Sequence, residues 1–247
     1  VPQFVFFTSF PPVTSRSPRW IVPGGTLLIG AILLSIATFN SGFSAAHPRP
    51  NTMSYLLDAN RGQASWVSSD RHLDDWKAQI MGANARQQQV EFGLSPVSNG
   101  FSAPAPLVNL PALEVQRLEP PTSSSKSTLR LRLKSPRQAS IAYVDLTTQG
   151  TIARAEIDRK PLDLTPLNPK QRQALKFIFF GLPPAGIELN LELTNSQSVQ
   201  MKLEDYTWGL PAISGKAIAP RPADLMPAPG HPDYTIVRKQ MTVTIEL

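Results

Sequence analysis

The sequence predicts a mainly β protein: an antiparallel β-sandwich-like extramembrane domain that follows one N-terminal transmembrane helix. Three observations support this prediction. An uncharged stretch lies between Arg19 and His47. Many segments after it alternate apolar and polar residues with the period of two that a half-buried strand requires. Residues that favour turns, mainly Gly, Pro and Asn, separate these segments at short intervals.

The uncharged stretch is long enough for a helix to cross a bilayer. Its centre, Leu27 to Phe39, is mostly apolar, and a spanning helix needs about 20 mostly apolar residues. We therefore predict a transmembrane helix at residues 20–46, preceded at residues 1–19 by the truncated end of another membrane segment and a loop. A signal peptide is the alternative, because two arginines precede the apolar run and Ser44-Ala45-Ala46 has the form of a cleavage site.

Both interpretations carry the remaining residues, 47–247, across the membrane. The positive-inside rule compares Lys and Arg in the flanking loops. Two arginines precede the helix, and Arg49 and Arg61 follow it, so the rule barely separates the two orientations. We predict that the large domain lies on the non-cytoplasmic side of the membrane.

The first part of this domain predicts two short strands. Met53 to Asp58 and Ala64 to Ser68 are rich in residues that favour strands, and Asn60-Arg61-Gly62 between them favours a turn. Together these segments predict a hairpin.

A short helix is expected next, at Asp74 to Ile80, with Ser69 or Asp70 as its N-cap and acidic residues in its first turn. A stretch rich in Pro, Ser, Asn and Gly then runs from Ser95 to Pro111 and predicts a loop. A boundary between two parts of the domain is therefore possible near residues 95–112.

From residue 113 onward the alternation of apolar and polar residues is strong. The basic residues at alternate positions around Arg130 are interpreted as the solvated face of one strand, opposite a row of leucines. Several short strands at this spacing favour an antiparallel sandwich. The predicted strands are Leu113 to Leu118, Leu129 to Leu133, Ser140 to Leu146, Thr151 to Ile157, Leu175 to Phe180, Ile187 to Leu193, Val199 to Leu203 and Tyr234 to Leu247.

The segment from Gly209 to Asp233 contains six prolines. Proline cannot donate a hydrogen bond to a neighbouring strand, so this segment cannot be a central strand. It is either an ordered loop packed over the sandwich or a flexible one. Leu225 and Met226 favour packing of at least part of it.

Composition excludes several classes of function. The chain has no cysteine, so disulfides, thiol catalysis and thiolate metal sites are excluded. Its net charge of +6 comes from scattered Lys and Arg residues without a basic run. With no recognisable nucleic-acid motif either, we expect no nucleic-acid partner.

No motif for catalysis or metal binding is present. The three histidines lie in different contexts, without an HExxH pattern, and there is no GxSxG elbow or glycine-rich phosphate loop. His72 lies near acidic residues, which we interpret as the solvated start of a helix. Glu204 and Asp205 point to opposite faces if they lie on a strand, so they cannot form a facing acid-base pair. We predict no catalytic residue and no metal ligand in this chain.

One group of aromatic residues is a candidate binding surface. Trp66, Trp76, Tyr206 and Trp208 could form a platform for a peptide or a sugar. The alternative is that these rings pack in the core or between parts of the domain.

Three phrases of the sequence resemble a known family. They are HPRPNTMSYLLDANRGQASWVSSDRHLDDW at His47 to Trp76, FIFFGLPPAGIELNLEL at Phe177 to Leu193, and DYTWGLPAISGKAIAPRPADLMPAPGHPDYTIVRKQMTV at Asp205 to Val243. Together they resemble the region after the membrane helices in membrane-bound zinc metallopeptidases of the aminopeptidase-type di-zinc family. These are relatives of the endoplasmic reticulum metallopeptidase and the fungal vacuolar membrane protease.

The resemblance implies that this chain is the non-catalytic C-terminal region of a zinc exopeptidase. The family's zinc ligands belong to an N-terminal peptidase domain, and that domain's pattern is absent here, so no catalytic residue is carried over. Zinc and the active site are expected in the missing domain, with which the chain would share the non-cytoplasmic face of the membrane. The alternatives are a stand-alone envelope β-sandwich that binds a peptide, glycan or protein, and an unfamiliar hydrolase built on the sandwich.

Overall fold

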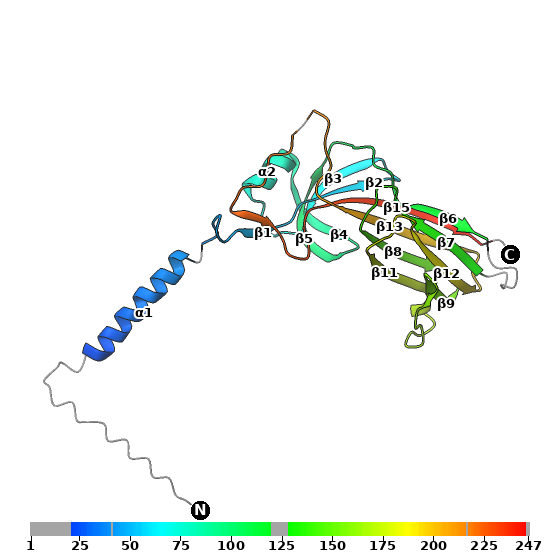
Figure 1. The fold of residues 1–247 in the computed structure, drawn as a ribbon, viewed down its shortest axis with the longest axis horizontal. Helices are drawn as coiled ribbons and strands as arrows, with labels where there is room; N and C mark the ends of the chain where they lie inside the picture. Colours follow the sequence, from blue (N-terminus) through cyan, green and yellow to red (C-terminus); the bar gives the residue numbers. More distant parts are fainter. Residues whose placement is uncertain (1–20, 41, 120–127, 216, 246–247) are drawn as a thin grey trace, which may run out of the picture.

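A computed structural model describes residues 21–40, 42–119, 128–215 and 217–245. The described part is mainly β, as predicted, and its strands form several sheets (Figure 1). The segment predicted at residues 1–19 lies outside the described residues. The helices are α1 (Ile21–Asn40) and α2 (Asp75–Met81), with short 3-10 helices η1 (Gly82–Asn84) and η2 (Gln171–Gln173). The strands are β1 (Arg49–Asn51), β2 (Ser54–Asp58), β3 (Gln63–Ser68), β4 (Arg86–Phe92), β5 (Ser95–Pro104), β6 (Glu114–Leu118), β7 (Thr128–Lys134), β8 (Ile141–Thr148), β9 (Thr151–Ile157), β10 (Lys160–Pro161), β11 (Ala174–Phe180), β12 (Ile187–Thr194), β13 (Ser198–Trp208), β14 (Leu225–Pro227) and β15 (Tyr234–Thr244).

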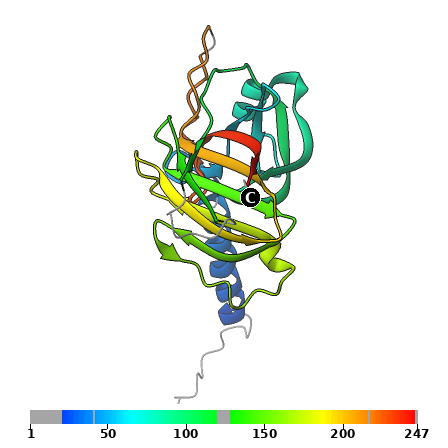
Figure 2. The same ribbon diagram turned by 90° about the vertical axis from the view of Figure 1, so that its right-hand side faces the viewer.

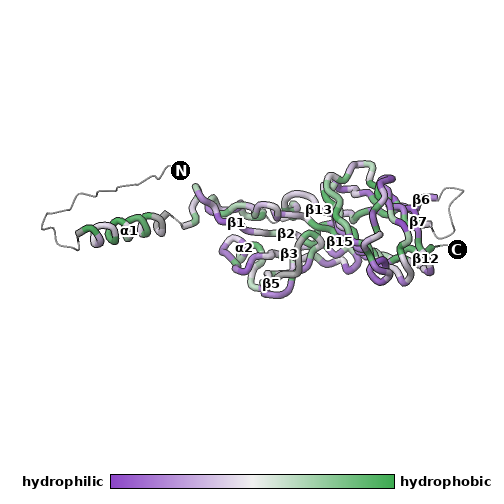
Figure 3. Tube along the Cα trace, turned by 90° about the horizontal axis from the view of Figure 1, so that it is seen from below, coloured by the Kyte–Doolittle hydropathy of each residue, from purple (hydrophilic) through white to green (hydrophobic). Residues whose placement is uncertain are grey.

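The uncharged segment forms one helix, α1, which stands away from the β-rich part of the chain (Figure 1). The helix ends earlier than the predicted range 20–46, because the chain after Gly42 bends and Ser44 and His47 exchange backbone hydrogen bonds of 3.0 Å in each direction. Most of α1 is apolar (Figure 3). Over the described residues, however, no helix meets the length and hydropathy expected of a membrane-crossing one. The predicted transmembrane helix is thus not found among them.

The largest sheet has eight strands in the order β11-β8-β13-β15-β2-β3-β5-β4. Its neighbours are antiparallel except β15 and β2, which run in parallel with Tyr234 opposite Ser54. A second parallel pair joins β1 and β14. The described strands are thus antiparallel, as the sequence predicted, apart from these two parallel pairs. Parallel partners need a long connection, and the alternation of side chains along a strand does not reveal the direction of its neighbour.

A five-stranded antiparallel sheet, in the order β10-β9-β12-β7-β6, packs against the β8 and β13 end of the large sheet. The view along the long axis shows the sheets as stacked layers (Figure 2). Leucines that alternate along β7 and β12, such as Leu131 and Leu189, are 0% exposed in the core between them. Each fully buried leucine contributes about 1.5–3 kcal/mol to folding. The intervening Arg130 and Arg132 face outward and pair with Glu188, as expected of a solvated face.

At its other end, the large sheet carries a second core beneath α2. The helix begins at Asp75 because the side chain of Asp74 accepts a hydrogen bond of 2.9 Å from the backbone N–H of Lys77. The N-cap is therefore Asp74. The sequence-based prediction of Ser69 or Asp70 as the N-cap was wrong. Asp70 instead accepts a hydrogen bond of 2.8 Å from the backbone N–H of Thr52.

The first ten residues of the predicted loop from Ser95 to Pro111 form strand β5 instead. This strand pairs with both β3 and β4, so the large sheet continues through the predicted boundary region at residues 95–112. Gly100 makes the pairing possible, because a Cβ at this position would lie 2.0 Å from the backbone oxygen of Ser68. A glycine that resembled a loop residue in the sequence is thus the residue that lets β5 lie close to β3.

A third core lies between the β4–β5 hairpin and the face of the large sheet opposite the sandwich. The hairpin covers this face only in part. Buried members of the cluster come from β3, β8, β13 and β15 and from β4 of the hairpin: Val67, Val90, Phe92, Ile141, Tyr206, Tyr234 and Ile236. The position of the hairpin decides which outward-facing side chains of the large sheet are covered.

The described part of the proline-rich segment 209–233 is an ordered loop, one of the two predicted alternatives. Its strand β14 pairs with β1 at an edge of the structure, and Leu225 is 8% exposed. Leu210, Ile213 and Ile218 pack against the core beneath α2. The segment thus covers the large sheet without joining it.

Candidate functional site

The four aromatic residues predicted as a possible binding surface do not lie on one surface. Trp66 and Tyr206 are each 1% exposed and Trp76 is 4% exposed, whereas Trp208 is 62% exposed. Trp66 and Trp76 lie in the core between α2 and the large sheet, and Tyr206 lies beneath the β4–β5 hairpin. Burial of their large apolar area stabilises the fold. Only Trp208 remains accessible to a partner.

Trp66 and Trp76 hold the core beneath α2 together. The Trp66 ring lies edge-on to Tyr55 with 5.3 Å between the ring centroids. The Nε1–H of Trp76 donates a hydrogen bond of 2.8 Å to the backbone oxygen of Ala219, and the Arg221 guanidinium lies 4.4 Å from the ring centroid. These contacts attach both α2 and the proline-rich segment to the large sheet.

Tyr206 and Trp208 occupy alternate positions of β13 and therefore face the same side of the sheet. The β4–β5 hairpin covers Tyr206, whose hydroxyl accepts a hydrogen bond of 3.3 Å from the backbone N–H of Leu94. Trp208 is the last residue of the strand and extends beyond this cover. Its ring lies 5.3 Å from that of Tyr234, its partner on β15, at an interplanar angle of 34°.

Trp208 forms one wall of a pocket of about 610 Å³, which we call the Trp208 groove. The ends of β8, β11, β13 and β15 and the loop after β14 supply its walls. Phe180 at the end of β11 is 69% exposed. Because aromatic and proline side chains dominate the lining, the groove suits apolar side chains of a partner. Its lining residues are Ser140, Ile141, Phe180, Gly181, Trp208, Pro227, Ala228, Pro229, Gly230, Pro232 and Tyr234.

Backbone hydrogen bonds hold the walls of the groove in place. The N–H of Gly181 donates to Ser140 at 2.7 Å, which fixes the chain after β11. On the other wall, the N–H of Ala228 donates to Asn51 at 3.0 Å and that of His231 donates to Ala228 at 3.1 Å. The prolines of this wall have a fixed φ angle and lose little conformational entropy on folding. The groove is thus largely preformed.

Near the groove, Glu204 is 0% exposed on the hairpin side of β13. Its carboxylate accepts hydrogen bonds of 2.7 Å from Arg238 Nε and 2.8 Å from the backbone N–H of Gly93, and it also accepts one from the hydroxyl of Tyr206. Burial, followed by the negative charge of Glu204, raises the pKa of Tyr206 far above its usual range. The phenol stays protonated and serves as a structural donor.

Asp205, also 0% exposed, has its partners in a different part of the chain. It accepts hydrogen bonds of 2.5 Å from Ser135 Oγ and 2.7 Å from Arg137. Glu204 and Asp205 thus have separate sets of partners, as their adjacent positions on a strand predict. They do not face each other as an acid-base pair, and both serve as buried ion-pair partners.

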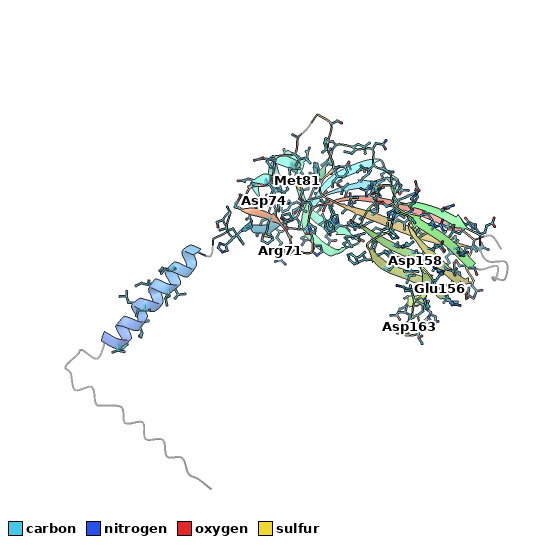
Figure 4. All side chains as sticks on the ribbon, viewed as in Figure 1. Arg71, Asp74, Met81, Glu156, Asp158 and Asp163 are labelled. Atoms are coloured by element: carbon cyan, nitrogen blue, oxygen red, sulfur yellow. The ribbon has the colours of Figure 1, made fainter. Side chains whose placement is uncertain are left out.

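The acidic residues near His72 surround a lysine. Lys77 is 1% exposed, and its Nζ lies 2.5 Å from Asp70 and 3.1 Å from Asp74 (Figure 4 labels Asp74). His72 lies in a bend on the surface. The cluster is thus an ion-pair network at the start of α2, consistent with the interpretation as a helix start.

Within residues 21–40, 42–119, 128–215 and 217–245, no group of three or more His, Asp and Glu side chains is arranged to hold a metal ion. The expectation from the resemblance, zinc in a separate peptidase domain, stays a prediction. Of the candidate residues, Trp208 is the one that the structure places in an accessible site.

No family model matches the chain, and no curated protein matches it. The resemblance to membrane-bound zinc metallopeptidases therefore depends on the three phrases alone. It enters the functional argument as a proposal.

Sequence reasoning missed Phe180, Tyr234 and Lys77. Phe180 precedes Gly181 and Tyr234 lies two residues after Pro232, so both are at strand ends near turn residues, a signal for an exposed rim. Only the pairing of β13 with β15 and with β8, and of β8 with β11, brings them to Trp208. Lys77 lies on the buried face of α2 between Trp76 and Ile80. A lysine at this position of the helix was the feature of the sequence that could have predicted an internal ion pair.

Proposed function

We propose that this chain is the non-catalytic, membrane-anchored C-terminal region of a zinc-dependent exopeptidase, which positions the peptidase domain of the same polypeptide. One observation supports this proposal most directly. The large apolar side chains that are exposed in the described residues gather mainly in two places, α1 and the vicinity of the Trp208 groove. Large uncovered apolar surfaces mark contacts with lipid or with a protein partner.

The first uncovered surface supports the membrane anchor. Eight large apolar side chains of α1 are at least half exposed, from Ile32 at 50% to Val22 at 76%. The helix has no acidic residue in its first turn and no basic residue in its last turn. Burial of such a helix in lipid removes its apolar side chains from water. We propose that the segment around α1 is the transmembrane helix that the sequence predicts.

The second uncovered surface supports a protein partner. Ile178, Phe180 and Trp208 are 40%, 69% and 62% exposed, and the last two line the groove. Aromatic side chains in preformed apolar pockets are frequent hot spots of protein interfaces. The resemblance implies that this partner is the peptidase domain, on the same non-cytoplasmic side of the membrane.

The DNA upstream of the Val1 codon tests the link to a peptidase. We expect an in-frame continuation that encodes His, Asp and Glu metal ligands and several apolar helices. A start codon directly before Val1 would instead support the alternative, a stand-alone envelope module that uses the Trp208 groove to bind a separate partner.

A substitution in the full polypeptide tests the role of the groove. Trp208→Ala should weaken the association of the two domains, because it removes the largest exposed ring of the groove. Limited proteolysis between the domains and cleavage of aminoacyl nitroanilides measure this association and the activity. Leu107→Ala is the matched control, since Leu107 is 64% exposed but does not line the groove. Equal effects of the two substitutions would contradict a docking role for the groove.

A further inference from the structure

The large sheet carries a second surface hollow, separate from the Trp208 groove and about 460 Å³ in volume. It lies over the central strands β8, β13 and β15, on the face opposite the sandwich core. The pairing of these strands aligns their outward side chains in two rows. We call these rows the polar platform, which consists of Thr147, Gln200 and Thr242 in one row and Asp145, Lys202 and Gln240 in the other.

The walls of the hollow come from neighbouring elements. The β4–β5 hairpin bounds it on one side, where Glu91 lies 3.0 Å from the Nζ of Lys202. The hairpin is held against the sheet by Gly93, since a Cβ there would lie 2.1 Å from the ring of Tyr143. On the other side, Lys176 of the edge strand β11 lies 3.0 Å from Asp145.

The charges on and around the platform cancel. Asp145 pairs with Lys176, and Lys202 pairs with Glu91, so two negative and two positive groups leave no net charge. A charged ligand would have to separate one of these pairs. The platform therefore favours a neutral ligand.

Uncharged hydrogen-bonding groups of the platform remain free to bind such a ligand. Among the described residues, the side chains of Gln200, Gln240, Thr147 and Thr242 have no hydrogen-bond partner. Strands in a sheet lie about 4.8 Å apart, so the platform presents donors and acceptors in a regular, nearly planar array.

The position of the platform favours a sugar over a peptide. An extended peptide binds a sheet by pairing with a free strand edge, but β8, β13 and β15 each have a neighbour on both sides. The hydroxyl groups of an oligosaccharide can pair with amide and hydroxyl side chains and need no free strand edge.

We propose that the polar platform binds a neutral oligosaccharide. The Gln200 and Gln240 carboxamides each donate to and accept from sugar hydroxyls, and Thr147 and Thr242 extend the contact along one row. This proposal does not depend on the proposed link to a peptidase.

Calorimetric titration of the full chain in phosphatidylcholine nanodiscs tests the proposal. The probes are cellohexaose, maltohexaose and chitohexaose, and nanodiscs avoid detergents with sugar head groups. We expect at least one of the three to bind and the variant with both Gln200→Ala and Gln240→Ala to lose at least tenfold in affinity. Gln116→Ala, an exposed glutamine on strand β6 of the other sheet, is the matched control and should bind as the unmodified chain does.

Two results would overturn the proposal. One is that none of the three sugars binds. The other is that binding survives in the double variant. Because both glutamines are exposed and have no internal partner, their replacement should leave the fold intact, and circular dichroism of the variant verifies this. A neutral extended peptide that binds in place of the sugars would assign the platform to peptide recognition.

Discussion

At the scale of single residues, the buried Lys77 shows how neighbouring carboxylates let a charged side chain stabilise the fold. The lysine is buried beside Asp70 and Asp74, and Asp74 also caps α2 through the backbone N–H of Lys77. Burial acts to raise the pKa of Asp74, but hydrogen bonds from Lys77 and Asn51 outweigh burial and hold the pKa below its usual value. The carboxylate therefore stabilises the fold in its ionised form.

We predict that Asp74→Asn lowers the free energy of unfolding by about 2 kcal/mol at pH 7, because it removes a charged hydrogen-bond partner of a buried lysine. A lowered pKa means that Asp74 contributes this stability above its ordinary value of 3.8 and loses it as the pH falls through the lower folded value. Urea titrations at pH 7, 4 and 3 should therefore show a shrinking difference between the two proteins.

The control for this prediction is Asp75→Asn, which changes an exposed acidic residue in the first turn of the same helix. It should change the free energy of unfolding by less than about 0.5 kcal/mol. A difference between Asp74→Asn and the unmodified chain that stays constant down to pH 3 would refute the assigned role of the ionised carboxylate.

Gly100 gives a second prediction at this scale. Gly100→Ala should lower the free energy of unfolding by about 1–3 kcal/mol, because the new methyl group meets the backbone oxygen of Ser68, which cannot rotate away. Thermal unfolding measures the effect. Gly42→Ala is the control, because a Cβ at Gly42 meets no atom within 4 Å. Equal melting temperatures for the two variants would show that β3 and β5 pair less closely than described.

At the scale of elements, α1 and the strands differ in how their apolar side chains are buried. The strands bury one or both faces in the three cores, whereas α1 contributes no residue to any of them. The leucine rows of β7 and β12 stabilise the sandwich. The apolar surface of α1 has no partner within the described part of the chain.

We predict that removal of residues 1–40 leaves the free energy of unfolding of the β-rich part within about 0.5 kcal/mol of its original value. The truncated protein should also stay in aqueous buffer without detergent, whereas the full chain sediments with membranes and resists carbonate extraction. Urea unfolding and membrane fractionation test both expectations. Strong destabilisation on truncation would mean that α1 packs against the domain.

At the scale of the whole molecule, one sheet joins two differently built halves. Strands β8 and β13 form a wall of the sandwich, and strands β2 and β3 of the same sheet lie beneath α2. Strand β15 connects the halves through continuous pairing with β13 and β2. Because each half provides pairing partners to the other, we expect the domain to unfold as one unit.

Leu191→Ala tests this cooperativity, since Leu191 is 0% exposed in the sandwich core, far in sequence from the tryptophans beneath α2. We predict a loss of about 3 kcal/mol from the cavity. The loss should appear equally in circular dichroism of the strands and in fluorescence of Trp66 and Trp76. Ile178→Ala, at an edge position 40% exposed, is the control with a small effect. Two separate transitions would show that the halves unfold independently.

The sequence by itself determined the strands with clear alternation, the short helix and the absence of recognised catalytic motifs. Alternation in β7 and β12 identified both the buried and the solvated faces, because each side chain's face depends only on its position along the strand. The same local rule correctly separated Glu204 from Asp205. These features are local, and neighbouring residues suffice to reveal them.

Only the tertiary structure decided which strands pair, which faces are covered and which charges meet. The parallel pairing of β15 with β2, the strand hidden in the polar residues around Gly100 and the cap at Asp74 all depend on contacts between distant segments. The same holds for the aromatics: Tyr206 and Trp208 have the same local pattern, but the β4–β5 hairpin covers one and not the other. Burial is a property of the assembled fold, which a residue's neighbours in sequence do not specify.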